Sequence, residues 1–270
     1  MYVPCGKCGN CLRRKIADYT ARLQFEARKS DDCYFLTLTF ADDPTNFFLD
    51  NYSDSFNPFK HQLQKFFKRL RKAGYRFKYF ALGDYGDTFG RPHYHVVTFS
   101  KASFPVETIH SIWAAGDSLG RGFIDLKPLT PGRISYVVRY GFLAKLDWDK
   151  RDDRPPPFFL MSRRPAVGAG YVTPAKIKYH LANQFWFFPD GKYRKALPRY
   201  WRDKIFLCPA LRKCHLIVYN YQAAVDRQVD ILYFKSPEKW QEAHRKQADL
   251  YLDLLRKQKN LNKKSYYNEK

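Results

Sequence analysis

The spacing of apolar residues predicts a regular alternation of helices and strands in the first half of the chain. Apolar positions three or four residues apart, with arginine and lysine between them, predict an amphipathic helix over residues 11–29. Asn57 and Pro58 form a typical helix start, and Gly74 a typical end. Thr130 and Pro131 predict the start of another helix, which runs to about residue 145.

Runs of β-branched and aromatic residues predict four strands, with a short helix before the last one. The strands are expected at residues 33–40, 75–83, 92–99 and 122–129, and the short helix at 106–113. The order through residue 129 is therefore β-α-β-β-α-β, which is typical of the split βαβ arrangement. We expect an α+β fold of the ferredoxin or RRM-like type, with an antiparallel sheet, both helices on one face, and the other face open for a ligand.

The remaining segments carry weaker patterns. We expect a loop over residues 41–57, irregular basic chain over 150–170, aromatic and basic chain over 171–208, and an amphipathic helix over 238–262 that frays from Lys257. Its inward side chains would be Ala248, Tyr251, Leu254 and Leu255. The predicted organisation has three parts: a cysteine-rich lead and basic helix (1–30), an α+β core (31–148), and a basic, aromatic, α-rich C-terminal extension (149–270).

The charge of the chain favours a polyanionic partner. Its 270 residues include 48 lysines and arginines against 26 aspartates and glutamates, which gives a formal net charge of +22. Such an excess favours nucleic acid ahead of an anionic membrane surface. There is no apolar run of the roughly 18 residues that would span a bilayer, and the first residues do not resemble a signal peptide. We expect an intracellular protein that does not bind a membrane.

Two histidines, His93 and His95, are the first candidates for chemistry. Alternate residues of a strand point to the same face, so the two imidazoles lie side by side. Asp84 ends the preceding strand, and a hairpin would bring its carboxylate beside them. Two nitrogens and one oxygen suit Mg²⁺ or Mn²⁺ at a phosphodiester. The alternative is two ordinary histidines on a half-exposed strand and an aspartate in a turn.

Two tyrosines, Tyr136 and Tyr140, are the second candidates. Residues four apart share one face of a helix, so both phenols project to the same side. Phenols titrate near pH 10, so attack on phosphorus requires an activated phosphate and a nearby cation. Arg139 and Lys145 are the candidate cations. The alternative role for this pair is packing.

Four cysteines could form a zinc site. Cys5, Cys8 and Cys11 are spaced like the ligands of a metal knuckle, and Cys33 could complete four thiolates around structural Zn²⁺. The alternative is that they remain reduced thiols, since structural sites usually show two separated pairs. Cys208 and Cys214 complete the six cysteines of the chain.

Several motifs in this order resemble a known family. They are Pro4-Cys-Gly-Lys-Cys-Gly-Asn-Cys11, Phe35-Leu-Thr-Leu-Thr39, Gly83-Asp-Tyr-Gly86, Arg91-Pro-His-Tyr-His95, Tyr136-Val-Val-Arg-Tyr140 and Leu160-Met-Ser-Arg-Arg-Pro165. Over most of residues 4–206 the chain resembles the replication initiation proteins of small circular single-stranded DNA phages. These microvirus, gokushovirus-like proteins are members of the His-hydrophobic-His endonuclease superfamily.

The resemblance implies metal-assisted nicking at a replication origin. One tyrosine would attack a phosphodiester, form a 5′-phosphotyrosyl link and free a 3′-OH that primes rolling-circle synthesis, and the second would act at the next round and rejoin the strand. His93 and His95 would be metal ligands, and Tyr136 and Tyr140 nucleophiles. Thr37 and Thr39 would fall in the family's first motif. Independently of the resemblance, Arg163 and Arg164 are candidate phosphate contacts, and the alternative is a solvated basic loop. The family usually has Glu where Asp84 stands, and Lys where Leu143 stands.

The implied partners are single-stranded or supercoiled circular origin DNA, with a host helicase and polymerase, in the host bacterial cytoplasm. Two other interpretations remain at this stage. One is a non-catalytic, RRM-like nucleic-acid-binding protein, which shares the β-α-β-β-α-β order. The other is a relaxase or transposase of the same superfamily.

Overall fold

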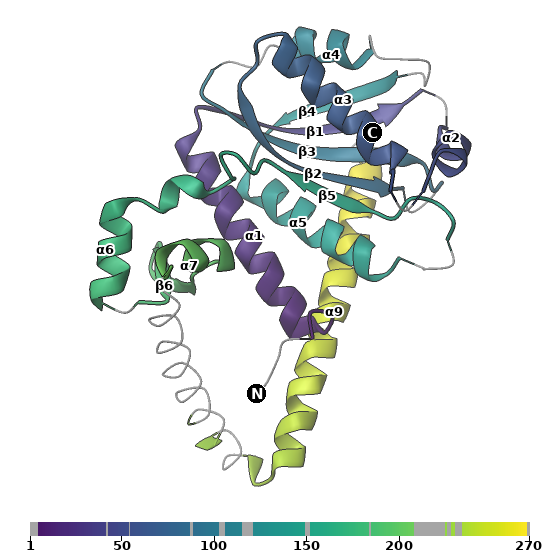
Figure 1. Cartoon of the computed structure of the whole chain (residues 1–270). Helices are drawn as coiled ribbons and strands as arrows, with labels where there is room; N and C mark the ends of the chain where they lie inside the picture. Colours follow the sequence, from purple (N-terminus) through teal and green to yellow (C-terminus); the bar gives the residue numbers. More distant parts are fainter. Residues whose placement is uncertain are drawn as a thin grey trace. The chain divides into compact units, whose positions relative to one another are not determined.

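A five-stranded antiparallel sheet is the centre of the larger of two compact units, residues 20–168 (Figure 1). The second unit contains residues 1–19 and 169–270. The computed structural model of the chain describes residues 5–268 except 42, 54, 87–88, 103–105, 115–120, 149–151, 184, 208–224, 226–227 and 230–233. Cys208 and Cys214 lie outside the described residues. The predicted division at residues 30 and 148 stays a prediction.

The strand order confirms the predicted α+β fold. The strands are β1 (Asp32–Phe40), β2 (Phe77–Tyr85), β3 (Pro92–Ser100), β4 (Arg121–Pro128) and β5 (Phe158–Met161). They are arranged β4-β1-β3-β2-β5 with every neighbour antiparallel. The first four form the split βαβ sheet, in which β2 and β3 are a hairpin.

β5 corrects the expectation of an irregular segment over residues 150–170. It pairs with β2, with Gly83 opposite Phe158 and Phe80 opposite Met161. A run of four apolar residues is too short to be recognised as a strand by its period. It becomes one because the edge of β2 offers unpaired backbone groups.

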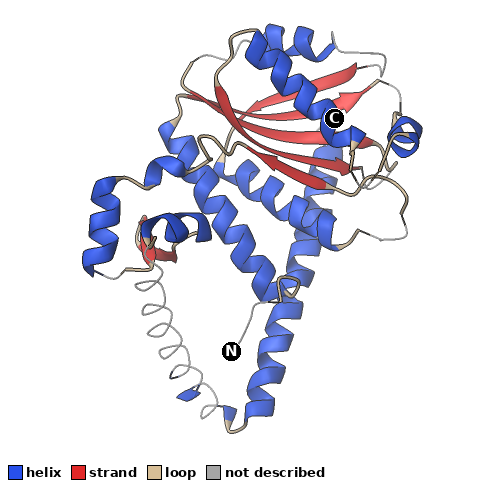
Figure 2. Ribbon diagram, viewed as in Figure 1, coloured by secondary structure: helices blue, strands red, loops and turns tan. Residues whose placement is uncertain are grey.

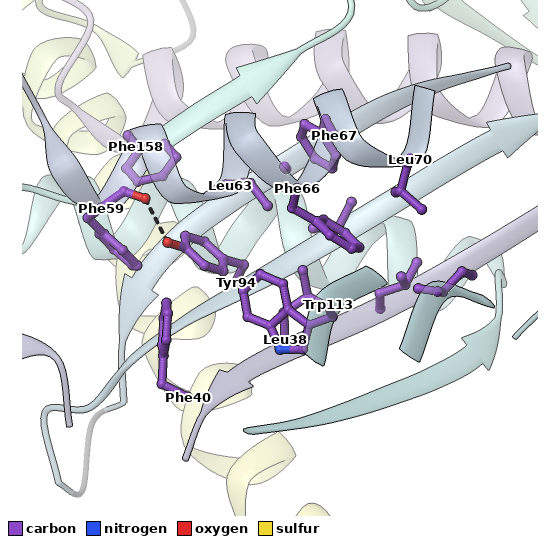
Figure 3. Packing of buried hydrophobic residues seen from close by; sticks show 14 of the residues in the cluster. Leu38, Phe40, Phe59, Leu63, Phe66, Phe67, Leu70, Tyr94, Trp113 and Phe158 are labelled. Atoms are coloured by element: carbon purple, nitrogen blue, oxygen red, sulfur yellow. Dashed lines mark hydrogen bonds between the residues drawn. The ribbon is translucent and has the colours of Figure 1, made fainter. Parts of the chain in front are cut away.

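Two helices pack on one face of the sheet, as predicted. They are α3 (Pro58–Lys72) and α4 (Val106–Ala114), which lie above the sheet in Figure 1. Phe59, Phe66, Tyr94 and Trp113 are fully buried between these helices and the sheet (Figure 3). The Tyr94 hydroxyl donates a 2.6 Å hydrogen bond to the carbonyl oxygen of Phe59, so its one polar atom is satisfied inside the core.

The predicted helix starts are confirmed in atomic detail. The side chain of Asn57 accepts a 2.8 Å hydrogen bond from the amide of Lys60 at the start of α3. The side chain of Thr130 accepts one from the amide of Arg133 at the start of α5 (Pro131–Leu146). The predicted loop 41–57 is wrong over α2 (Thr45–Asp50), a helix whose buried Phe48 packs against the core rings of Phe40 and Phe59.

On the second face of the sheet, α5 packs against β2 and β5, so the expectation of a fully open face is wrong (Figure 1). Gly141 allows the close approach. A Cβ atom at this position would lie 2.4 Å from the ring of Phe159 on β5 and 3.1 Å from the side chain of Leu82 on β2. The helix that carries Tyr136 and Tyr140 therefore packs directly on the strands that carry the candidate metal ligands.

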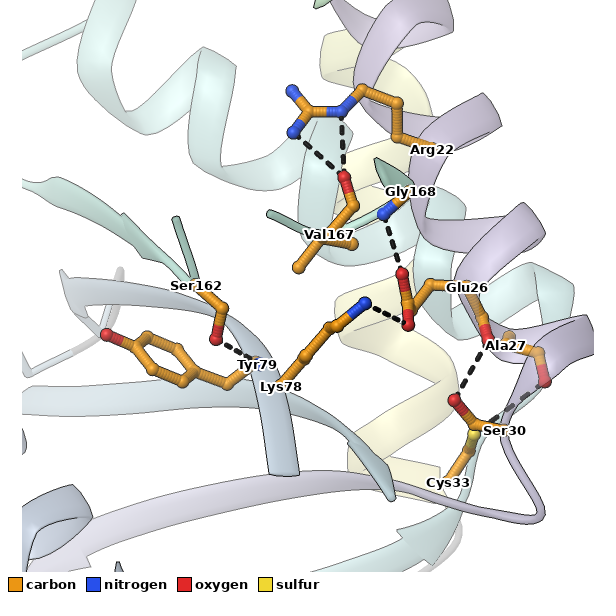
Figure 4. A network of polar contacts seen from close by, with 10 residues as sticks. All are labelled: Arg22, Glu26, Ala27, Ser30, Cys33, Lys78, Tyr79, Ser162, Val167 and Gly168. Atoms are coloured by element: carbon orange, nitrogen blue, oxygen red, sulfur yellow. Dashed lines mark hydrogen bonds and ion pairs between the residues drawn. The ribbon is translucent and has the colours of Figure 1, made fainter. Parts of the chain in front are cut away.

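A polar network fixes the C-terminal half of α1 (Gly9–Lys29) to β2 and to the segment after β5 (Figure 4). The carboxylate of Glu26 accepts 2.7 Å hydrogen bonds from the Lys78 ammonium and from the Gly168 amide. The Arg22 guanidinium donates to the carbonyl oxygen of Val167 at 2.9 and 3.2 Å. These charged side chains are buried or half-buried, and each makes a charge-assisted hydrogen bond that compensates for its loss of contact with water.

The second unit is mostly helical in its described residues (Figure 2). It contains the first part of α1, a 3₁₀ turn (Ala169–Tyr171), α6 (Pro174–Asn183), the hairpin of β6 (Phe187–Asp190) and β7 (Tyr193–Ala196), α7 (Arg199–Ile205), and α9 (Pro237–Asn268). Tyr171 stacks on Trp201 with ring centroids 4.0 Å apart, and its hydroxyl lies 2.8 Å from Nε2 of the buried His180.

The C-terminal helix is longer than predicted. α9 continues to Asn268, beyond the expected fraying point at Lys257. Ala248 and Leu255 are buried as predicted, but Leu254 is 49% exposed. Among the residues that the structure describes, no helix is both long enough and apolar enough to span a bilayer.

Candidate metal and tyrosine site

His93 and His95 lie on β3 with their imidazoles facing each other. Their Nε2 atoms are 3.2 Å apart, and the two rings meet edge to face. Two nitrogens that each lie about 2.1 Å from one metal ion are separated by about 3.0–3.4 Å, the range set by right-angled and tetrahedral geometry. The observed separation therefore fits a pair of ligands of one ion.

Hydrogen bonds fix the orientation of both imidazoles. Nδ1 of His93 lies 3.2 Å from the carbonyl oxygen of Arg91, which can only accept, so Nδ1 carries the proton and Nε2 the lone pair. Nδ1 of His95 lies 3.3 Å from the Thr37 hydroxyl, which can donate or accept. When the hydroxyl accepts, Nε2 of His95 also has a free lone pair. This arrangement matches the outer-shell support typical of metal-bound histidines.

Asp84 lies directly opposite His93 in the pairing of β2 with β3. Residues in opposite positions of an antiparallel pair project from the same face, so its carboxylate is on the face of the imidazoles. The side chain is only 4% exposed. A carboxylate with two imidazoles is a donor set that suits Mn²⁺ or Mg²⁺, although the Asp84 oxygens do not lie within 4.8 Å of both imidazoles. The predicted ligands therefore share one face of one hairpin.

His95 is held in the neutral form that a metal requires. Burial, and then the neighbouring His93, keep the pKa of His95 well below its usual range. The ring of Phe35 stacks on it with centroids 5.5 Å apart. Sequence reasoning missed Phe35, although it precedes Thr37 by two residues on β1 and so lies on the same face.

Both predicted nucleophiles lie over His95. The ring centroids of Tyr136 and Tyr140 are 6.0 and 5.9 Å from that of His95, and both rings meet it edge-on. The two phenol rings stack on each other at 5.6 Å with planes 18° apart. Tyr140 is 7% exposed, whereas Tyr136 is half-buried. The helix and the hairpin thus place on one face of the sheet five residues that the sequence singles out: Asp84, His93, His95, Tyr136 and Tyr140.

The two predicted cations on α5 differ in their position relative to the tyrosines. At about 100° per residue, Lys145 lies about 140° around the helix from Tyr140, and its side chain is exposed. Arg139 is half-buried and follows Tyr136 by three residues, so the two are neighbours about 60° apart on the helix surface. The catalytic role of both cations stays a prediction.

Of the residues predicted to contact DNA, Thr39 makes a hydrogen bond within the sheet, whereas Arg163 and Arg164 are exposed to solvent. Thr39 donates a 3.1 Å hydrogen bond to the carbonyl oxygen of Phe123, which ties β1 to β4. Arg163 and Arg164 are exposed in the turn after β5. That turn is anchored at Ser162, whose hydroxyl accepts a hydrogen bond from the Tyr79 amide. The two arginines are therefore presented to solvent from a fixed segment.

The hairpin between β2 and β3 has a support that sequence reasoning missed. Tyr85, next to Asp84, points to the opposite face and donates a 2.8 Å hydrogen bond to the carbonyl oxygen of Pro155. The Arg154 guanidinium lies 4.5 Å from the Tyr85 ring centroid and donates to the carbonyl oxygen of Gly90. Burial raises the pKa of Tyr85 far above its usual range, so its phenol stays protonated.

Cysteines form a separate cluster. The ligand atoms of Cys5, Cys8 and Cys11 lie within 4.8 Å of one another, and they are the one group of three such side chains among the described residues. Cys33 is not part of it. Its sulfur lies 3.9 Å from the carbonyl oxygen of Ala27, and the stretch of α1 from Cys11 to Ala27 spans about 24 Å. The expectation of Cys33 as a fourth thiolate is therefore not supported.

Comparison with known proteins matches the first four strands of the sheet and α5 to a family of replication proteins. Residues 33–145 match the family model of replication-associated protein ORF2. The match begins in β1 and ends in α5, so it includes every residue of the metal and tyrosine site.

Three phage proteins are similar over about three quarters of the chain. Replication-associated protein VP4 of Bdellovibrio phage phiMH2K is 26% identical, over 74% of this chain and 66% of its own length. Replication-associated protein ORF4 of Chlamydia phage 1 is 26% identical, over 74% and 53%. Replication-associated protein ORF2 of Spiroplasma virus 4 is 28% identical, over 76% and 70%. The chain thus spans between half and two thirds of the length of the first two relatives.

A solved structure, hypothetical protein ORF119 from Sulfolobus islandicus rod-shaped virus 1, is 19% identical over 49% of this chain and 97% of its own. Its TM-score of 0.32 is too low to establish a shared fold. The similarity to the three phage proteins and the family match confirm the predicted resemblance to phage replication initiators.

Proposed function

We propose that this chain, whose residues 33–145 match the family model of replication-associated protein ORF2, initiates rolling-circle replication by nicking single-stranded origin DNA with a tyrosine. The attacking phenol oxygen forms a bond to phosphorus, and the bond from phosphorus to the 3′-oxygen breaks. The tyrosine gives up one proton and the departing 3′-oxygen takes up one. The 5′ end of the strand remains on the tyrosine, and the free 3′-OH primes synthesis.

The observation that carries this proposal is the position of both phenols over one member of the histidine pair. Tyr136 and Tyr140 contact His95 at nearly equal distances and stack on each other. Two similarly placed nucleophiles at one site suit a mechanism in which a strand is cleaved in two successive rounds. In the reverse direction, a 3′-OH attacks the phosphotyrosyl bond and rejoins the strand.

His93, His95 and Asp84 are the residues that would hold a divalent ion, Mg²⁺ or Mn²⁺. Such an ion, when bound, draws electron density from a phosphoryl oxygen and makes phosphorus a better electrophile. The chain itself supplies the orientation. Thr37 and the Arg91 carbonyl oxygen fix the two imidazoles, while Phe35 and α5 exclude water from His95.

We infer that Tyr136 acts in the first round. It is the more exposed of the two phenols, so an incoming strand reaches it with less rearrangement than Tyr140 requires. Tyr140 would act when the first phenol already carries DNA. Single Phe variants should therefore each keep partial activity, with the greater loss for Tyr136→Phe.

The proposed partner is circular origin DNA in the host bacterial cytoplasm, with a host helicase and polymerase. The net charge of +22 supports a nucleic-acid partner. An RRM-like binder is the weaker interpretation, because such a module stacks bases on its central strands, and here the tyrosines of α5 lie against His95 on the central strand β3. The three similar phage proteins are named for replication, which favours an initiator over a relaxase or transposase.

The test is a covalent-adduct assay with a pool of single-stranded oligonucleotides whose central segment is randomised. With Mn²⁺, the wild type should give a protease-sensitive protein–DNA band on a denaturing gel, and excess EDTA should abolish it. The double variant Tyr136→Phe/Tyr140→Phe should give no band. The matched control, Tyr179→Phe/Tyr193→Phe, changes two exposed tyrosines and should retain it. Wild-type adduct yield in the first double variant would exclude the assigned nucleophiles.

A further inference from the structure

Three aromatic side chains form a row at the surface of the second compact unit, from α6 to β6 (Figure 1). The ring centroids of Tyr179 and Phe185 are 5.7 Å apart, and those of Phe185 and Phe187 are 4.6 Å apart. Tyr179 is 44% exposed, and the two phenylalanines are only partly buried. All three residues of this aromatic row therefore keep contact with solvent, although the unit has a buried core in which such rings could pack.

A cation lies at each end of the aromatic row. The Lys176 ammonium is 5.7 Å from the Tyr179 ring centroid, and the Arg194 guanidinium is 4.8 Å from that of Phe187. Both cationic residues are exposed. Neither has an ion-pair partner among the residues that the structure describes. The two positive charges are thus placed to receive negative groups at both ends of a strip of rings.

The pairing of β6 with β7 shows which face of the hairpin carries the aromatic row. Arg194 lies opposite Pro189, two residues after Phe187, so Phe187 and Arg194 share one face. Phe188 projects from the other face, where it is buried and packs against Trp201 with ring centroids 5.2 Å apart. The face that carries the row is therefore turned away from the buried rings of this unit.

Hydrogen bonds fix the turn that joins α6 to β6. The Phe185 amide donates to the carbonyl oxygen of His180 at 3.2 Å, and Nδ1 of the buried His180 lies 2.8 Å from the carbonyl oxygen of Phe185. Because this carbonyl can only accept, Nδ1 carries the proton, and Nε2 accepts the 2.8 Å hydrogen bond from the Tyr171 hydroxyl. A ligand would meet rings that are already positioned, which lowers the entropic cost of binding.

The segment around the row is basic. Residues 169–206 contain eight lysines and arginines and two aspartates. Both carboxylates are already paired, Asp190 with Lys195 and Asp203 with Arg199. Accessible rings flanked by unpaired cations favour single-stranded nucleic acid, because its bases stack on the rings while its phosphates bind the cations. In a duplex the base faces are stacked on one another and are not available to the row.

We propose that the aromatic row, with Lys176 and Arg194, binds single-stranded DNA by stacking bases on its rings and contacting phosphates at both ends. The row belongs to a different compact unit from the metal and tyrosine site, and it lies outside the residues 33–145 that match the family model. That the strand is DNA rests on the proposed function, whereas the stacking does not. This second contact would hold a strand before it is nicked as well as after.

The first measurement is photocrosslinking of the full-length chain to a single-stranded oligothymidine in which 5-iodouracil replaces some thymines. EDTA is present, so the proposed nicking reaction does not contribute. Trypsin cuts after Lys178 and Lys192, so the three rings fall on one peptide, residues 179–192. We expect this peptide to carry crosslinked nucleotide. Crosslinks confined to other peptides would overturn the site. A failure of the Mn²⁺-dependent adduct assay would contradict the proposed function and leave this result unaffected.

Tyr179→Ala should weaken binding of the oligothymidine by about tenfold in fluorescence anisotropy, because one stacking ring is lost. Tyr179→Phe keeps the ring and should bind as the wild type does. Tyr193→Ala is the matched control, since it removes an exposed tyrosine from the other face of the same hairpin, and should also leave the affinity unchanged. Equal affinities of Tyr179→Ala and the wild type, or an equal loss for a duplex of the same length, would contradict stacking.

The two cations are tested by salt titration of the same oligothymidine. Lys176→Ala/Arg194→Ala should lower the salt slope by about 1.4, which corresponds to two phosphate contacts. Lys239→Ala/Lys246→Ala removes the same charge from α9 and should leave the slope unchanged. A slope equal to that of the wild type in the first double variant would exclude these two phosphate contacts. Tighter binding of oligouridine than of oligothymidine would overturn DNA as the ligand.

Discussion

The proton on Nδ1 of His95 determines whether the histidine pair can act as a metal clamp. His93 has its lone pair on Nε2 because Nδ1 donates to the Arg91 carbonyl oxygen. His95 then has two choices. With Nε2 protonated it donates to His93, and with Nδ1 protonated it donates to Thr37 and faces His93 with a second lone pair. Two facing lone pairs 3.2 Å apart repel each other unless a cation lies between them. Thr37 accommodates both states, since its hydroxyl accepts or donates.

Phe123 is a candidate stacking residue for a nucleobase. It is 84% exposed on β4, two residues before Asp125, which lies opposite Thr37. The pairing of β4 with β1 shifts register between Ile124 and Arg121, and at this irregularity the ring is presented to solvent next to the strand that carries Thr37. Stacking of a base on an aromatic ring contributes about 1–3 kcal/mol.

We expect Phe123→Ala to weaken binding of a single-stranded oligonucleotide by about tenfold, measured by fluorescence anisotropy. The melting temperature should not fall, because an exposed side chain contributes little to the core. Leu250→Ala, which removes an exposed apolar side chain from α9, should leave both values unchanged. An affinity for Phe123→Ala equal to that of the wild type would exclude a stacking role.

At the scale of elements, the distance between α5 and the sheet controls the site. Gly141 follows Tyr140 directly, and there is no room for a Cβ atom against Phe159. Gly141→Ala should therefore push α5 away from β5 and β2 and move both phenols from His95. Overpacking of this kind costs about 1–3 kcal/mol of unfolding free energy. Adduct yield should fall by more than about tenfold, because small displacements of reacting groups are costly.

The matched control is Gly132→Ala in the first turn of the same helix. A Cβ atom at Gly132 would meet nothing closer than 3.7 Å. Alanine has the higher helix propensity, so this variant should be neutral or stabilised by about 0.5 kcal/mol in urea unfolding, with full adduct yield. Equal adduct yields from Gly141→Ala and Gly132→Ala would show that the approach of α5 does not position the tyrosines.

The helices and strands that are determined by neighbouring residues in the sequence were predicted correctly. Asn57 and Thr130 cap their helices through side-chain oxygens, and the alternation in β1 and β3 puts Thr37, His93 and His95 on one face. β5 and α2 were missed because each depends on tertiary contacts, one with the edge of β2 and one with the core around Phe48. The packing of α5 on the second face of the sheet was missed, because no short-range sequence pattern shows that Gly141 contacts Phe159.

The candidate site was predictable because its residues lie in short motifs. His93 and His95 are two residues apart, Tyr136 and Tyr140 are four apart, and Asp84 lies next to the last residue of the strand that pairs with β3. Residue spacing cannot reveal that α5 folds back over the hairpin. Nor can it reveal that α9 packs on Gly9, because the two segments are far apart in the sequence.

For the whole molecule, the excess of positive charge predicts binding to DNA that weakens steeply with salt. When the logarithm of the binding constant is plotted against the logarithm of the salt concentration, each contact to a phosphate of single-stranded DNA steepens the slope by about 0.7. Replacing the exposed Arg163 and Arg164 with alanine should lower the slope by about 1.4 in a salt titration of oligonucleotide binding. A slope unchanged from that of the wild type would exclude both as phosphate contacts. The control is Lys239→Ala/Lys246→Ala in α9, which removes the same charge and should leave the slope as it is.

The most direct test of the central claim is to find which residue carries the DNA. Adduct formed with Mn²⁺ is trimmed with nuclease to one nucleotide, digested with trypsin and analysed by mass spectrometry. Trypsin cuts after Arg133, Arg139 and Lys145, so Tyr136 and Tyr140 fall on separate peptides, residues 134–139 and 140–145. We predict a 5′-linked nucleotide on one or both of these peptides, mainly the first. A nucleotide on any other peptide would contradict the proposed nucleophiles, and DNA bound tightly without any covalent link would contradict the proposed reaction.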